Sequence, residues 1–176
     1  MVVGLDAAPP ILLYRSLRRN LPTLSQLIGD SCRFVLNSCH PPITIPAWLS
    51  MITGKTPGEL GMYGFRHRKP GDYLDYYIVN YRSVKCPTLW DVLGSKGLRS
   101  IVVGVPPTYP PRPIRGVLVS CFITPNSKVD YTFPPQLKFE IEKLVEKLER
   151  EGTDARLIRK YLKRVKQRAS AKRSMR

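Results

Sequence analysis

The chain has 176 residues, of which 43% are hydrophobic, and it carries a formal net charge of +16. This length suits a single domain, and the apolar content is enough for a core, which excludes wholesale disorder. No apolar run reaches the roughly 18 residues of a membrane-spanning helix, and the start lacks the basic region of a signal peptide. We therefore expect a cytoplasmic protein with no membrane span.

The predicted elements begin with an apolar run at residues 2–5, which indicates a buried strand that ends at Asp6. Helices are predicted at 9–19 and 21–28, and a second strand at 33–36. Prolines exclude a regular helix over 40–46 and place Thr44 at the mouth of a helix over 46–53, which Gly54 ends. Later in the chain, the patterns predict strands at 76–79, 100–105 and 117–122, and helices at 88–95 and 135–150.

The strands alternate with helices, and they are continuous apolar runs. This pattern predicts an α/β layered fold with a mostly parallel central sheet flanked by helices. In such folds functional residues gather at the carboxyl ends of strands, which fits the positions of Asp6 and Thr44.

The positive charge is concentrated at the end of the chain. Residues 156–176 contain ten Lys or Arg and no acidic residue. We divide the chain into a domain over 1–150 and a basic C-terminal helix or tail over 151–176. Such a tail can bind nucleic acid or an anionic surface, and it can equally be the solvated face of a helix.

Thr44 and Asp6 each allow a structural and a chemical interpretation. A threonine before a helix is commonly a cap, but its hydroxyl becomes a nucleophile when a metal activates it. The helix N-terminus beside it would offer free N–H groups to a phosphate. Asp6 is either a turn residue or a metal ligand, and a ligand would need further carboxylates or histidines nearby.

The four cysteines form no CxxC pair, and the two histidines, His40 and His67, lie far apart in the sequence. This spacing excludes a zinc finger, and we expect reduced, partly buried thiols. We interpret His40 as structural and His67 as a surface residue.

Several motifs in order resemble the start of one known family. They occupy residues 4–6, 40–48, 53–58, 61–65, 88–91, 105–111, 120–125 and 131–135. The most specific is His-Pro-Pro-Ile-Thr-Ile-Pro-Ala-Trp over 40–48. Residues 1–150 are similar to the N-terminal part of the type I phosphodiesterase and nucleotide pyrophosphatase family, in its prokaryotic and archaeal branch. The family belongs to the alkaline phosphatase superfamily, so the resemblance implies an incomplete core of that fold.

The resemblance also implies roles for particular residues. Asp6 would bind a metal, and Thr44 would be both the nucleophile and a metal ligand in a site for two divalent cations, zinc or manganese. The Ile45 amide would donate to a phosphoryl oxygen. Asn80 is a second phosphate-donor candidate, or simply a turn residue after a strand. The substrate would be a phosphorylated small molecule, nucleotide-like or a phosphodiester.

The resemblance implies ligands that this chain lacks. The family's other ligands are mostly histidines and aspartates from its C-terminal half, including an Asp-His pair, which does not occur here. We therefore expect a truncated hydrolase with exposed apolar surface, inactive without a complementing C-terminal polypeptide. Two alternatives stay open, a basic nucleic-acid-binding protein that uses its tail, and a non-catalytic remnant of the hydrolase.

Overall fold

A computed structural model describes residues 1–16, 20–126 and 128–151 of the chain. Its helical elements are η1 (Leu12–Ser16, a π-helical turn), α1 (Pro22–Gly29), α2 (Thr44–Thr53), α3 (Pro57–Leu60), η3 (Tyr81–Ser83, a 3-10 turn), α4 (Leu89–Ser95) and α5 (Leu137–Arg150). Its strands are β1 (Arg66–Arg68), β2 (Tyr76–Ile78), β3 (Ser100–Val103), β4 (Gly116–Val119) and β5 (Thr132–Phe133). The basic tail predicted over 151–176 lies outside the described residues from 152 onward.

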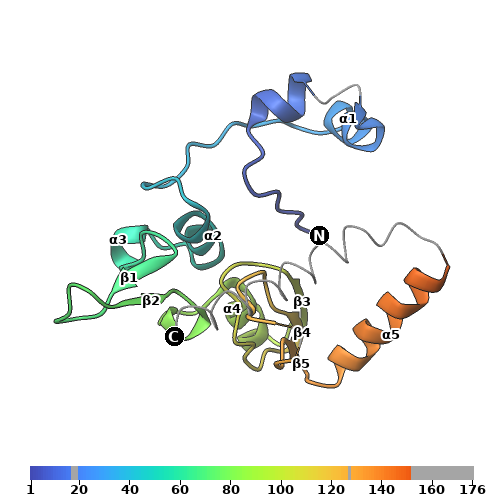
Figure 1. Ribbon diagram of the computed structural model, residues 1–176. Coiled ribbons are helices and arrows are strands. Elements are labelled where there is room, and N and C mark those ends of the chain that lie inside the picture. Colours follow the sequence, from blue (N-terminus) through green and yellow to red (C-terminus); the bar gives the residue numbers. More distant parts are fainter. Residues whose placement is uncertain (17–19, 127, 152–176) are drawn as a thin grey trace.

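The strands form two small sheets (Figure 1). β1 and β2 make an antiparallel hairpin, whereas the other sheet has the order β3-β4-β5. Within it β3 and β4 run parallel, and β5 is antiparallel to β4. The α/β class is confirmed, but this sheet is mixed, with one parallel pairing where we expected a mostly parallel sheet.

Gly116 permits the parallel pairing at its first position. It lies opposite Ser100 with a φ of 138°, and an added Cβ would lie 1.9 Å from the Ser100 carbonyl oxygen. Only glycine tolerates both this conformation and this approach. The pairing of β3 with β4 therefore depends on the absence of a side chain at residue 116.

The strands predicted at residues 2–5 and 33–36 do not form in this structure. Both segments are irregular backbone, and their apolar side chains are exposed, including Val2 at 81% and Leu36 at 89%. A strand requires a neighbour for its backbone hydrogen bonds, and neither segment pairs with one of the described strands. The expectation of buried strands was therefore wrong for the structure as described.

The helix predictions fared better. α1, α4 and α5 lie within two residues of the expected bounds, whereas α2 begins at Thr44, two residues earlier than expected. Gly54 ends α2 in the left-handed conformation, with a φ of 68°, and its N–H donates to the Ser50 carbonyl. The helix predicted over 9–19 is described only to residue 16, where a π-helical turn occupies Leu12–Ser16.

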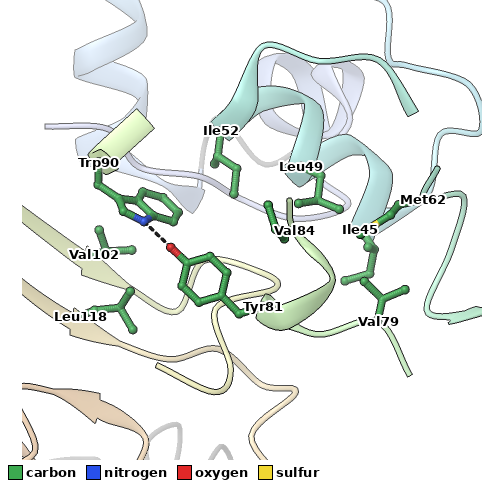
Figure 2. Close-up of a cluster of buried hydrophobic side chains, with 10 residues drawn as sticks. All are labelled: Ile45, Leu49, Ile52, Met62, Val79, Tyr81, Val84, Trp90, Val102 and Leu118. Atoms are coloured by element: carbon green, nitrogen blue, oxygen red, sulfur yellow. Dashed lines mark hydrogen bonds between the residues drawn. The ribbon is translucent and has the colours of Figure 1, made fainter. Parts of the chain in front are cut away.

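The core lies between α2 and one face of the β3-β4-β5 sheet (Figure 2). Ile45, Leu49 and Ile52 project from one side of α2 and are buried. Val102 and Leu118 face the core from β3 and β4. The remaining buried members of the cluster are Met62, Val79, Tyr81, Val84 and Trp90. A hydrogen bond from the Trp90 indole N–H to the Tyr81 hydroxyl satisfies the polar atoms of these two rings within the core.

On the opposite face of the sheet, the β3 side chains are exposed within the part of the chain that the structure describes. Ile101 and Val103 flank the buried Val102 in β3, and they are 80% and 65% exposed. Phe139 and Leu144 of α5 are exposed as well. Exposed apolar surface of this kind marks a place where a partner or a further element can pack.

The described residues contain no helix that is both long enough and apolar enough to cross a membrane. The four cysteines are free thiols, and Cys121 is the one that is buried.

A capping box holds the segment that follows α2. The Thr56 side chain accepts the Glu59 backbone N–H, and the Glu59 carboxylate accepts the Thr56 backbone N–H at 2.8 Å. This N–H, together with the Lys55 ammonium and the Thr56 hydroxyl, lowers the pKa of Glu59 from 4.5 to about 2.

We predict that Leu49→Ala lowers the free energy of unfolding by about 2–5 kcal/mol, because it removes a fully buried side chain from the core. Urea unfolding followed by circular dichroism measures the change. Met51→Ala, an exposed site on the same helix, is the matched control and should shift the midpoint little. Equal midpoints for the two variants would contradict the packing described here.

The capping box predicts a pH dependence of stability. Because the folded-state pKa of Glu59 is depressed, its contribution is present above pH 4.5 and is lost as the pH falls toward about 2. The stability difference between the wild-type chain and Glu59→Gln should therefore shrink over that range in urea unfolding. A difference that stays constant from pH 6 to pH 2 would show that the charge on Glu59 contributes nothing, since Gln can also accept in a capping box.

Candidate functional site

Helix α2 presents two adjacent faces with different roles. Ile45, Leu49 and Ile52 are buried in the core. Thr44 and Trp48 lie one turn apart, so their side chains share the neighbouring face. The burial of Ile45, Leu49 and Ile52 therefore determines the direction in which Thr44 and Trp48 point.

The sequence explains why α2 begins at Thr44. Ile43 is extended, with φ −113° and ψ 152°, and the first helical bond runs from the Ala47 N–H to the Ile43 carbonyl at 3.0 Å. Pro46 is tolerated in the first turn because its missing N–H would have no helical acceptor there. The Thr44 and Ile45 N–H groups precede the helical ladder, and neither has an acceptor within the described residues.

Asp6 receives one hydrogen bond on each carboxylate oxygen, both from α2. The Thr44 hydroxyl donates to Oδ2 at 3.2 Å, and the Trp48 indole Nε1 donates to Oδ1 at 3.4 Å. Asp6 is otherwise exposed. The structure thus brings together Asp6 and Thr44, two residues that are 38 positions apart in the sequence.

The backbone around Asp6 is unusual on both sides. Ala7 has a φ of 54°, a left-handed conformation that is strained for a residue with a Cβ. An added Cβ on Gly4 would lie 2.1 Å from Cη2 of Trp48, so the Gly4 backbone packs directly against the indole ring. The chain before Asp6 therefore passes in direct contact with Trp48 at Gly4.

Ile45 and Asn80, the two predicted phosphate donors, lie in different settings. Ile45 is fully buried, and its N–H lacks an acceptor in the described part of the chain. Asn80 caps η3, where its Oδ1 accepts the Arg82 N–H at 2.9 Å and its Nδ2 donates to the Ile78 carbonyl. These are the contacts of a turn residue, and none of them joins Asn80 to Asp6 or Thr44.

Asp6 and Thr44 carry donor atoms that suit a divalent cation, but two side chains are too few to hold one. A carboxylate and a hydroxyl are the oxygen donors that such ions accept. Among the described residues, however, no group of three or more His, Cys, Asp and Glu side chains lies close enough to hold a metal. Asp6 and Thr44 can therefore supply part of one site.

Neither histidine has a hydrogen bond to Asp6 or Thr44 among the described residues. His40 is exposed. His67 is half-buried in β1, where its Nε2 accepts the Tyr63 N–H at 3.2 Å and its ring lies near those of Tyr63 and Tyr77. His67 is thus less of a surface residue than we expected.

Sequence reasoning did not assign a role to Trp48 or Gly4. Both residues occur in the motifs that carry the family resemblance. The available signal was the one-turn spacing of Thr44 and Trp48, which places both side chains on one side of a helix. Their common partner could be found only from the structure.

A hydroxyl that contacts a carboxylate at the N-terminus of a helix with free N–H groups is an arrangement suited to phosphoryl transfer. A sequence model of the type I phosphodiesterase / nucleotide pyrophosphatase family matches residues 1–174, so the chain belongs to that family. A search of the curated proteins found no match, and neither did a search of the solved structures. The family relationship supports a hydrolase of phosphodiester or pyrophosphate bonds, while the roles of individual residues stay predictions.

We predict that Gly4→Ala separates Trp48 from Asp6, because the new methyl group would overlap the indole ring. Acrylamide quenching of tryptophan fluorescence measures this, since the other tryptophan, Trp90, is buried. The quenching constant should rise in Gly4→Ala. Gly64→Ala, where an added Cβ meets nothing within 4 Å, should match the wild-type chain. Equal quenching in all three proteins would contradict the close packing at Gly4.

Proposed function

We propose that this chain provides the nucleophile of a metal-dependent phosphodiesterase or nucleotide pyrophosphatase. The observation that carries the proposal is the contact of the Thr44 hydroxyl with Asp6 Oδ2, at 3.2 Å, at the first residue of α2. The family membership supports the same reaction class.

In the proposed reaction the Thr44 oxygen attacks phosphorus and displaces the leaving oxygen of the ester or pyrophosphate. The Thr44–phosphate ester is then cleaved by water, which restores the hydroxyl. The free N–H groups of Thr44 and Ile45 are suited to bind a phosphoryl oxygen, and a buried N–H without a partner gains most from such an acceptor. Asn80 would join them through its Nδ2 group, because its Oδ1 caps η3.

Two divalent cations, zinc or manganese, complete the proposed site, and Asp6 and Thr44 would hold one of them. A bound cation would lower the pKa of the Thr44 hydroxyl and offset the negative charge of the substrate. The further ligands must come from outside the described residues. We propose a complementing polypeptide as their source, and the exposed face of β3 offers it an apolar surface.

The finer description of the fold also belongs to this proposal. A layered core like that of alkaline phosphatase, with a mostly parallel sheet, would require further strands beside β3. The cytoplasmic location likewise stays a proposal, based on the composition of the chain.

The test is the metal-dependent hydrolysis of bis-(p-nitrophenyl) phosphate. We expect the purified chain alone to stay at background, because two donors cannot hold two cations. With a polypeptide that supplies the missing histidines and aspartates, hydrolysis should appear and should be lost on adding a chelator. Thr44→Ala should lower that rate by at least about a thousandfold, since it removes the nucleophile.

Thr44→Ser is the matched control, because it retains a hydroxyl at the same position, and it should keep measurable activity. A complemented Thr44→Ala protein as active as the wild-type would overturn the proposed function. Metal-dependent and Thr44-dependent turnover by the chain alone would overturn the claim that its site is incomplete. Salt-sensitive nucleic-acid binding without any hydrolysis in the complemented protein would favour a binding protein instead.

A further inference from the structure

Trp48 has no role in the proposed reaction, yet it contacts the same carboxylate as the nucleophile. Its indole N–H donates to Asp6 Oδ1, while the Thr44 hydroxyl donates to Oδ2. Both donors come from one face of α2, one turn apart. The Asp6 carboxylate therefore lies beside α2, and each of its two oxygens accepts a hydrogen bond from one of these donors.

We propose that Trp48 is the positioning residue for Asp6, and that it holds Oδ1 so that Oδ2 alone faces Thr44. The inference rests on the proposed function for the role of Asp6 as a ligand. It goes beyond that function by assigning the two carboxylate oxygens different tasks.

The physical reason lies in the freedom of an aspartate side chain. An aspartate side chain has three staggered χ1 rotamers and a terminal torsion with a broad, roughly two-fold energy profile, so a single hydrogen bond leaves its orientation poorly defined. Asp6 is exposed and follows irregular backbone, so no surrounding core restricts its orientation. A second hydrogen bond, from a donor on a packed helix, defines the plane of the carboxylate.

The oxygen that binds Trp48 is also less available to a cation. A carboxylate with one oxygen held by an N–H donor is suited to bind an ion through its other oxygen. Outer hydrogen bonds of this kind orient metal-binding carboxylates generally, and their loss commonly weakens metal binding by about 10–100-fold. Oδ2 would therefore be the atom that Asp6 shares between Thr44 and a cation.

The packing around the indole ring supports a fixed position for the donor. Gly4 leaves no space beside Cη2 of Trp48, and Leu49, the next residue of α2, is buried. The ring is thus confined on one side by the segment that carries Asp6. Residues 4–6 thus contact Trp48 twice, through the Gly4 backbone and through the Asp6 carboxylate.

The chain contains two tryptophans, which makes a direct test by nuclear magnetic resonance practical. The Trp90 indole N–H donates to Tyr81 in the core and serves as an internal control. Trp48→Phe, which keeps an aromatic ring beside Gly4, assigns the two indole resonances by the loss of one. Asp6→Ala should then move the Trp48 indole proton upfield, because it loses its acceptor, and should leave the Trp90 resonance in place.

The second readout concerns Asp6 itself. In the wild-type chain its Hα–Hβ couplings should indicate one side-chain rotamer, and in Trp48→Phe they should shift toward averaged values. A purely structural role of Trp48 would leave the Asp6 rotamer unchanged. An unmoved Trp48 resonance in Asp6→Ala, or unchanged Asp6 couplings in Trp48→Phe, would overturn the inference.

Addition of Mn²⁺ separates this inference from the proposed function. If Asp6 binds a cation, the paramagnetic ion should broaden the Trp48 indole resonance before that of Trp90, and Asp6→Ala should abolish the difference. Equal broadening in the wild-type and Asp6→Ala would contradict the ligand role of Asp6. The metal-free shifts and couplings decide the positioning role of Trp48 independently.

Discussion

The burial of one face of α2 is the constraint on which the site depends. Ile45, Leu49 and Ile52 pack against the core, so the helix cannot rotate about its axis without exposing them. The fixed orientation of α2 about its axis determines the direction of Thr44 and Trp48, which contact Asp6 from the adjacent face. The core thus positions a hydroxyl, an indole N–H and the free backbone N–H groups of Thr44 and Ile45.

Elements with a local signal could be predicted from the sequence. Gly54 ends α2, α4 forms within one residue of the bounds predicted for it, and the apolar run that contains β3 is a strand, since each depends on neighbours in the chain. The strands expected at residues 2–5 and 33–36 depend on a partner for their hydrogen bonds, and the sequence does not say whether a partner is in place. The hairpin of β1 and β2 was missed because β1 carries no apolar alternation that indicates a strand.

The site could be predicted in part. The motifs that contain Asp6 and Thr44 identified the pair, and the structure brings them into contact. Trp48 and Gly4 could not be assigned, because their importance lies in distances across the fold. Asn80 is an equivocal residue in sequence, and its hydrogen bonds in the structure are those of a helix cap. The shortage of ligands, by contrast, was readable from the sequence, since two histidines and no Asp-His pair leave few donors.

The central claim is that Asp6 and Thr44 together form one end of a cation site beside α2. The most direct measurement is anomalous scattering from crystals of the chain bound to a polypeptide that supplies the missing ligands, grown with Zn²⁺. The account predicts an anomalous peak within bonding distance of Asp6 Oδ2 and the Thr44 hydroxyl, with Oδ1 still bound to Trp48. Zinc bound elsewhere, with Asp6 turned away from α2, would contradict it.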